Sequence, residues 1–283
     1  MTDIQIRPMT QQDIPLGMKL KSLARWNQQE LDWQLLLNSG KGGNFVATYK
    51  GAEAGTVTTL SYQNRFSWIG MVLVDPEFRG LGIGTKLLRE AIKFAQTKGT
   101  VRLDATPQGK KLYETMGFKT ERNLLRLERK SQKDSSYIEK KLLNITEGIL
   151  PEINYWDKQV FGADRGVILG HLVKNFPQYC FYTTQNKNIN SYCLGRSGSN
   201  FEHIGPLIAN KKEKALDLLK EFLKNCQGKS LIIDVFEEKQ SWVNLLKDLG
   251  FEVQRPFIRM YLGELEYPGI PENQFAIAGP ELG

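Results

Sequence analysis

Residues 72–85 read VLVDPEFRGLGIGT and connect a predicted strand to a predicted helix. The strand is the apolar run Phe66–Val74, and a helical spacing of apolar residues continues over Thr85–Thr97. Three glycines and one arginine occupy the connection: Arg79, Gly80, Gly82 and Gly84. Because glycine has no Cβ, backbone N–H groups here can converge on one point beside the positive end of the helix dipole. The connection is therefore a predicted anion-binding site.

Two other phosphate-binding loops do not fit this connection. A P-loop needs a Lys followed by Ser or Thr after its last glycine, whereas Thr85 precedes Lys86 here. A dinucleotide fingerprint needs the spacing G-x-G-x-x-G, whereas these glycines alternate with single residues and follow strands of antiparallel character. A tight turn without a ligand is a further alternative, although three glycines behind an arginine are more than such a turn requires.

The rest of the chain alternates predicted strands and helices, which indicates an α/β fold (α+β, with mixed sheets). In the first half we expect strands at Ile4–Arg7, Asn44–Tyr49, Thr56–Tyr62, Val101–Ala105 and Phe118–Leu127, and helices within Gln11–Asn38 and at Gln108–Met116. In the second half we expect helices within Ile149–Val173 and at Lys211–Asn225 and Gln240–Leu249, with strands at Tyr179–Thr183, Ser191–Gly195, Phe201–Gly205, Ser230–Val235 and Phe251–Leu262.

The two halves end alike. KLYETMGFKTERNLLRL begins at Lys111 and NLLKDLGFEVQRPFIRM at Asn244, and a strand bearing an aspartate, Asp104 or Asp234, precedes each. Four pairs share the same offset: Gly117 and Gly250, Phe118 and Phe251, Arg122 and Arg255, Arg126 and Arg259. A repeat at about 133 residues predicts two copies of one domain. A chance match is the alternative, since glycine commonly follows a helix.

A polar segment separates the two copies. Residues 128–141 read ERKSQKDSSYIEKK and contain almost no apolar side chain that a core would bury. We therefore predict a first domain over residues 1–130, a linker over 131–141 and a second domain over 142–283. The expected architecture is two mixed sheets with flanking helices.

Two motifs together resemble a known family. Arg79-x-x-Gly82-x-Gly84 follows Val74-x-Pro76, and Leu112-Tyr113-Glu114-x-x-Gly117-Phe118 follows about 30 residues later. In this order and at this distance, they resemble the GNAT superfamily of N-acetyltransferases. The whole layout, including FAIAGPELG from Phe275, is similar to the two-domain YitH-like branch.

The resemblance implies acetyl-CoA as acyl donor, and it implies where the donor binds. The pyrophosphate is expected on the backbone amides of the connection: Arg79, Gly80, Leu81, Gly82, Ile83, Gly84 and Thr85. The backbone of Val72, Leu73 and Val74 is expected to hold the pantetheine arm as an added strand. No metal is expected.

The resemblance also implies catalytic residues. Tyr113 matches the tyrosine that protonates the departing thiolate, and packing of α-helix on sheet is its alternative role. A backbone N–H near Val72 is expected to stabilise the oxyanion. Asp104 is the candidate base, with capping of the next helix or pairing with Arg102 as alternatives. The histidines, His171 and His203, are expected to be structural.

The second copy departs from the pattern. The segment from Gly205 to Lys212 lacks the three glycines and the arginine, and Leu246 stands where the tyrosine is expected. We predict a degenerate GNAT-like copy that no longer binds the donor and instead forms a wall of the acceptor pocket. Polar groups at Gly195–Gly198 and Glu281 are candidates to line that pocket.

The expected function is transfer of an acetyl group from acetyl-CoA directly to a primary amine of a small molecule. A protein N-terminus or lysine as acceptor is one alternative, and a non-catalytic CoA-binding sensor is another. The net charge of +7 comes from scattered basic residues, which favours neither nucleic acid nor a membrane as partner. The 3 cysteines form no C-x-x-C pair, so we expect a reducing compartment. We also expect a cytoplasmic location and a monomer or homodimer.

Overall fold

All 13 strands belong to one continuous mixed sheet in the computed structural model, which describes residues 3–132, 142–186 and 188–283. The strand order is β1-β2-β3-β4-β5-β12-β6-β11-β10-β9-β8-β7, and β13 pairs with β10 off this path. The expectation of two separate sheets is therefore wrong. The bounds are β1 (Ile4–Pro8), β2 (Phe45–Tyr49), β3 (Ala52–Tyr62), β4 (Phe66–Val74), β5 (Thr100–Ala105), β6 (Lys119–Arg129), β7 (Leu143–Asn144), β8 (Phe181–Gln185), β9 (Asn188–Arg196), β10 (Glu202–Ala209), β11 (Leu231–Phe236), β12 (Glu252–Leu262) and β13 (Gln274–Ala276).

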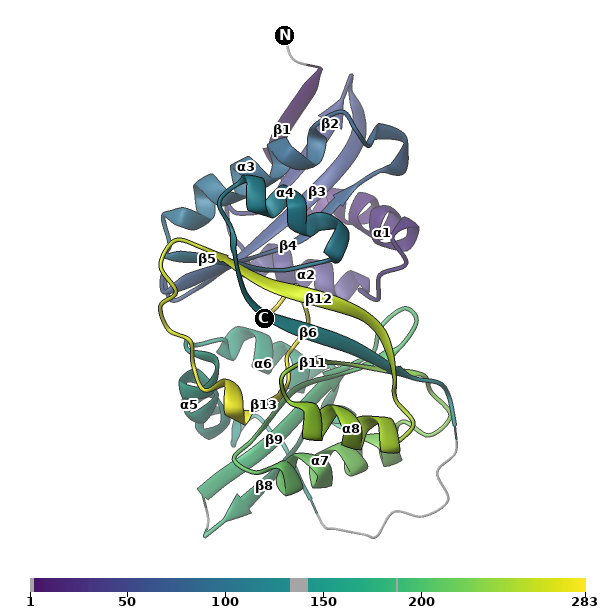
Figure 1. Cartoon of the computed structure of the whole chain (residues 1–283), viewed down its shortest axis with the longest axis vertical. Helices are drawn as coiled ribbons and strands as arrows, with labels where there is room; N and C mark the ends of the chain where they lie inside the picture. The colour runs from purple at the N-terminus through teal and green to yellow at the C-terminus, as the bar shows by residue number, and fades with distance from the viewer. Residues whose placement is uncertain (1–2, 133–141, 187) are drawn as a thin grey trace.

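The helices flank this sheet (Figure 1). Their bounds are α1 (Ile14–Leu23), α2 (Glu30–Ser39), α3 (Ile83–Gln96), α4 (Pro107–Thr115), α5 (Leu150–Phe161), α6 (Gly166–Asn175), α7 (Lys212–Asn225) and α8 (Gln240–Asp248). Leu87 and Leu88 of α3 are fully buried in one hydrophobic core, which they form together with residues of the strands that α3 packs against. A second, larger core runs from Trp33 of α2 to Ile153 of α5. Because this core includes residues of both halves, the halves are packed as one body.

The two halves exchange their last long strands. β6, from the first half, pairs with β11 of the second half, and β12, from the second half, pairs with β5 of the first. β6 and β12 also pair with each other, and Figure 1 shows them side by side at the centre of the molecule. Each copy of the repeat is thus completed by a strand of the other.

The C-terminal tail is buried against β3 and β4. Tyr62 donates a hydrogen bond from its hydroxyl to the carbonyl oxygen of Leu282 (2.6 Å), and Trp68 donates from Nε1 to that of Pro280 (2.8 Å). Arg165 donates to Gly283 (3.1 Å). Since buried polar groups need such partners, these hydrogen bonds hold the tail in place.

The two central strands of the first half agree closely with the sequence prediction. β4 has the predicted bounds, while β3 begins four residues before its predicted start, at Ala52. Residues 133–141 of the predicted linker lie outside the described residues. Among the residues that are described, no helix combines the length and apolar character needed to cross a membrane.

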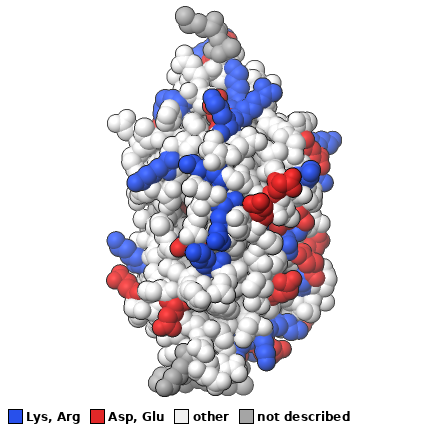
Figure 2. Space-filling view, turned by 90° about the vertical axis from the view of Figure 1, so that its left-hand side faces the viewer, with Lys and Arg blue, Asp and Glu red and all other residues white. Residues whose placement is uncertain are grey.

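Figure 2 shows charges of both signs on one face, with Lys and Arg gathered mainly in its upper part.

Candidate active site

β4 and β5 separate after a short parallel contact. Their pairing covers Phe66–Trp68 of β4 and Thr100–Arg102 of β5. Just beyond it, β4 has a bulge at Met71, whose φ is 50°, and Thr56 donates from Oγ1 to the Met71 carbonyl (3.0 Å). A bulge re-aims the strand and ends its regular pairing. The β5-facing edge of Val72–Val74 is therefore left without a strand partner and can bond an extended ligand.

The glycine connection lies at the end of this free edge. Gly80 and Gly82 have φ values of 81° and 82°, in the left-handed region that glycine adopts easily. A Cβ at either position would meet no atom within 4 Å, so open space adjoins the loop. Gly82 is the N-cap of α3 and supplies no side-chain hydrogen bond to the first turn. The first N–H groups of α3 are thus available to an anion, and a phosphate fits there.

A cavity of about 820 Å³ follows the separation of the two strands. Residues of β4, of the glycine connection and of α4 line one part, and residues of the second half line the other. The second half contributes Arg255, Phe257, Pro280 and Glu281. A volume of this size is typical of small-molecule and cofactor sites.

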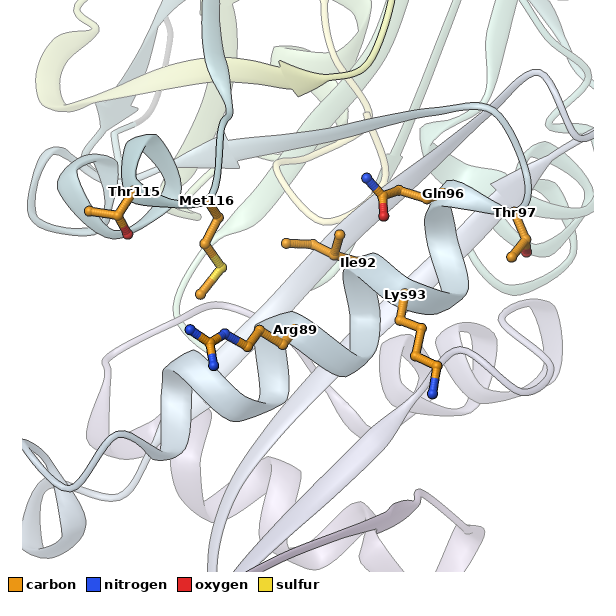
Figure 3. Close-up of a pocket in the computed structure, with 7 residues that line it drawn as sticks. All are labelled: Arg89, Ile92, Lys93, Gln96, Thr97, Thr115 and Met116. Atoms are coloured by element: carbon orange, nitrogen blue, oxygen red, sulfur yellow. The ribbon is translucent and has the colours of Figure 1, made fainter.

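A second hollow lies on the outer side of α3. Figure 3 shows Arg89 and Ile92 of this helix extending toward Met116, which follows the end of α4, whereas Lys93 points away from it. None of the residues around this hollow belongs to the lining of the larger cavity. Because the free strand edge and the glycine connection are elsewhere, we place the candidate site in the larger cavity.

Tyr113 lines the cavity from α4. Its ring covers Gly109, where a Cβ would approach Tyr113 Cε2 to 3.0 Å, and meets Phe118 edge-on at 5.9 Å between ring centroids. The side chain of Thr106 caps this helix by accepting a hydrogen bond from the Gly109 N–H (3.2 Å). Burial raises the pKa of Tyr113 to about 12. The hydroxyl therefore keeps its proton at neutral pH and is able to donate it.

Asp104 lies beside the same cavity but is held by an ion pair. Both of its carboxylate oxygens accept hydrogen bonds from Arg259, at 2.9 and 3.0 Å, and its side chain is fully buried. Burial raises the pKa of Asp104, and Arg259 opposes this shift. Both alternative partners suggested by the sequence are wrong, because Thr106 caps α4 and Arg102 donates to the carbonyl of Glu266 (2.7 Å). The assignment of Asp104 as base stays a prediction.

Glu281 is the carboxylate that the sequence indicated only as a polar contact. A Cβ on Gly70 would come within 3.0 Å of the Glu281 Cα, so the tail passes directly over β4, one residue before the bulge. The carboxylate forms an ion pair with Arg196, which also contacts Asp32 at 3.1 Å. Burial raises the pKa of Glu281, but Arg196 and several smaller contributions together outweigh burial and leave the pKa lowered. Glu281 is therefore anionic at neutral pH.

The predicted site residues thus come together at one cavity. Val72, Leu73, Val74, Arg79, Gly80, Gly84, Asp104 and Tyr113 all line it. Leu81, Gly82, Ile83 and Thr85 complete the same connection but do not line the cavity itself. Among the aromatic residues of the first half, Trp26 lines the cavity, whereas Trp33, Tyr62 and Trp68 are buried in the core.

Both halves of the chain match family models. Residues 12–118 match the Acetyltransferase (GNAT) family, and residues 153–276 match the Acetyltransferase (GNAT) domain. Together with the separated parallel strands and the glycine connection, these matches define a GNAT-type acyltransferase. The chain belongs to the GNAT superfamily of N-acetyltransferases and contains two GNAT domains in tandem, which confirms the family predicted from the sequence.

Relatives of known sequence support this family. The chain is 25% identical over 262 residues to Holothin acyltransferase of Pseudoalteromonas sp. (strain SANK 73390). The aligned residues cover 92% of this chain and 87% of the relative. It is 27% identical over 188 residues to Uncharacterized N-acetyltransferase YitH of Bacillus subtilis (strain 168), and these aligned residues cover 66% of each protein.

Solved structures show the same fold. A candidate acetyltransferase from Pyrococcus horikoshii superposes with a TM-score of 0.82 at 22% identity, over 100% of this chain and 97% of that chain. A GCN5-related N-acetyltransferase from Sphaerobacter thermophilus has a TM-score of 0.67 at 14% identity, over 95% of this chain and 97% of that chain. The fold of this chain, with both halves included, is thus shared with proteins of known structure.

Proposed function

We propose that this protein transfers an acetyl group from acetyl-CoA to a primary amine of a small molecule. One observation carries the proposal. A single cavity joins the glycine connection and the free edge of β4 to Tyr113 and to side chains of the second half. Donor-binding and acceptor-facing groups therefore meet in one place, as direct transfer requires.

The first half has the groups needed to hold the donor. The N–H groups of residues 79–85 are placed to bind its phosphates, and the free edge of Val72–Val74 is placed to bond its pantetheine arm. When bound, acetyl-CoA supplies a thioester whose carbonyl carbon an amine attacks. The N–H of Val72, next to the bulge, is our candidate donor to the oxygen that gains negative charge.

Tyr113 is the proposed general acid. Its hydroxyl lies in the cavity lining, and among the described residues no hydrogen-bond partner occupies it. Because its pKa is raised, it retains a proton for delivery to the departing sulfur.

We assign removal of the amine proton to Glu281 and not to Asp104. Arg259 engages both oxygens of Asp104, which leaves that carboxylate a positioning role between β5 and β12. The other cluster holds two carboxylates, Asp32 and Glu281, against the single guanidinium of Arg196. Burial raises the pKa of Asp32, whereas Arg196 and smaller contributions hold the pKa of Glu281 below its usual range, so Glu281 keeps its charge for an incoming ammonium.

The second half supports a small acceptor. Its loop at Ser199–Phe201 is tied to the turn between α1 and α2, because the Asn27 side chain accepts from the backbone N–H groups of Asn200 and Phe201, both at 3.0 Å. Pro280 and Glu281 of the tail close another side. A protein acceptor needs an open groove, whereas these contacts place the loop and the tail beside the cavity, which favours an acceptor smaller than a protein.

The second copy has its corresponding gap filled, which supports its proposed loss of donor binding. β10 and β11 pair in parallel over Glu202–Ile204, as β4 and β5 do, and then separate. Beyond that point, β13 pairs with Leu207 and Ile208 of β10. Since β9 occupies the other edge of β10 at these residues, β13 lies where an extended donor would bind. Leu246, in the place of the tyrosine, is buried.

A turnover screen tests the proposal. Purified protein is mixed with acetyl-CoA and a panel of amino acids, polyamines and aminoglycosides, and release of free CoA thiol is measured. We expect amine-dependent release with at least one class, and mass spectrometry should show a product heavier by one acetyl group. Tight acetyl-CoA binding without turnover of any amine would instead favour a CoA-binding sensor. Peptides are assayed alongside the panel, and acetylation of these peptides alone would favour a protein acceptor.

A further inference from the structure

Two arginines lie opposite each other on neighbouring strands at the cavity wall. Arg255 of β12 is the register partner of Arg126 of β6, and both line the cavity. Both guanidinium groups pack on the ring of Phe257, at 5.0 and 5.1 Å from its centroid. Like charges directly opposite on adjacent strands are destabilising. The pair therefore needs a compensating negative charge.

Of these two arginines, only Arg126 has a direct ion-pair partner among the described residues. Arg126 donates two hydrogen bonds to Asp234, both at 2.7 Å. The Nε of Arg255 is buried and, in the part of the chain that the structure describes, lacks a hydrogen-bond partner. Burial, with a smaller contribution from Arg126 and an opposing one from Asp234, lowers the pKa of Arg255 to about 10, so it remains charged at neutral pH. A half-buried cation without a counterion is costly unless a ligand supplies one.

The surroundings of Arg255 leave room for such a ligand. A second pocket of about 700 Å³ adjoins the cavity and shares Ala24, Trp26, Arg126 and Arg255 with it. No described Asp or Glu belongs to its lining. Of the other cations in this pocket, Lys21 donates to the Ser199 hydroxyl and is attracted by Asp32, Arg126 pairs with Asp234, and Arg25 is exposed to solvent. Arg255 is therefore the partly buried cation of this pocket that has no direct ion-pair partner among the described residues.

We propose that Arg255 binds a carboxylate of the acceptor, so that the acceptor class is an amine that carries a carboxylate. This inference rests on the proposed function for the identity of the ligand as an acceptor. A guanidinium binds a carboxylate with two parallel hydrogen bonds, and one positive charge is balanced by one negative charge. Because Arg255 and Glu281 both line the larger cavity, the carboxylate end lies at Arg255 and the amine end faces Glu281.

Matched pairs of amines test this inference. Glycine and glycinamide, and phenylalanine and phenylalaninamide, differ in the carboxylate but keep the amine. Their acetylation is compared for the wild-type protein, for Arg255→Gln and for Arg25→Gln, the matched control on an exposed arginine of the same pocket. Phosphoethanolamine is included as a phosphate-bearing amine. Binding of the same compounds is measured independently by saturation-transfer NMR.

We expect the wild-type protein to prefer the acid over its amide by at least about tenfold in kcat/KM, mainly through KM, which is the size of one charge-assisted contact. Arg255→Gln should remove the preference, and Arg25→Gln should retain it. Equal use of acids and amides by the wild-type protein, retention of the preference by Arg255→Gln, or a preference for phosphoethanolamine would overturn the proposal.

The NMR arm separates this inference from the proposed function. If no amine is acetylated but the amino acids bind the wild-type protein and not Arg255→Gln, the carboxylate subsite stands and the proposed function fails. If the amino acids do not bind the wild-type protein, the subsite fails. Thermal unfolding gives a second readout. Because Arg255→Gln removes a repulsion, its Tm should equal or exceed that of the wild-type protein, and a lower Tm would indicate a structural role instead.

Discussion

Arg259 of β12 donates two hydrogen bonds to Asp104 of β5, at 2.9 and 3.0 Å, and these residues come from different copies of the repeat. The equivalent pair is formed in the reverse sense by Arg126 of β6 and Asp234 of β11. The two ion pairs are also register partners in the sheet. The exchange of β6 and β12 thus places a matched charge pair at each of its two seams.

Asp104→Asn tests whether this residue is a structural partner or the base. Removing one member of a buried ion pair leaves the other unpaired, so we expect a loss of about 3–5 kcal/mol in the free energy of unfolding. The double variant Asp104→Leu/Arg259→Met should be closer to the wild-type protein, because it leaves no buried charge. Urea unfolding measures both. A fully stable Asp104→Asn with greatly reduced kcat would restore Asp104 as base.

Tyr113→Phe tests the general acid. The ring packing on Gly109 and Phe118 is kept, so acetyl-CoA binding should change less than about twofold, while kcat should fall by roughly 10²–10⁴. Calorimetry and steady-state kinetics across the pH range separate the two effects. Undiminished acetylation over that range would refute the assignment.

Glu281→Gln tests the proposed proton acceptor against a matched neighbour, Asp32→Asn. Both carboxylates contact Arg196, but only Glu281 belongs to the cavity lining. We expect kcat/KM to fall by roughly 10²-fold or more in Glu281→Gln and far less in Asp32→Asn. If both variants lose activity equally, the cluster has only a structural role.

Acid sensitivity of folding follows from Asp234. Burial alone raises the pKa of this carboxyl, but Arg126 and His203 hold it well below its usual range. Its contribution to stability is therefore complete above the unfolded-state pKa of about 3.9 and is lost as the pH falls toward the folded-state value. Urea unfolding between pH 7 and pH 3 should show the wild-type protein losing stability below about pH 4. In Asp234→Asn this acid-dependent part should be absent, and an unchanged acid slope would contradict the ion-pair assignment.

Much of the fold could be predicted because local patterns determine it. The apolar run of β4 and the amphipathic spacing of α3 appear where expected, since each depends on nearby residues alone. The strand exchange was not predictable, because β6 and β12 share one pattern and fit either position. The partner of Asp104 depends on that exchange, and therefore the sequence suggested the wrong alternatives for it.

The donor side of the site was likewise more predictable than the acceptor side. The left-handed conformations of Gly80 and Gly82 could be predicted, because glycine is the residue that adopts a positive φ most easily. Glu281 and Arg255, in contrast, reach the cavity only through the path of the tail and the exchange of β12. Their contribution depends on contacts between residues far apart in the chain, and no local spacing encodes it.

Titration calorimetry with acetyl-CoA tests the central claim most directly. The wild-type protein is compared with Gly82→Val and with Gly228→Val, whose glycine has a similar φ of 76° and equally open surroundings in the second half. We predict one acetyl-CoA per chain, a loss of affinity of at least about tenfold (about 1.4 kcal/mol) in Gly82→Val, and unchanged affinity in Gly228→Val. Two equivalent sites per chain, or intact affinity in Gly82→Val, would contradict a single donor site at the glycine connection.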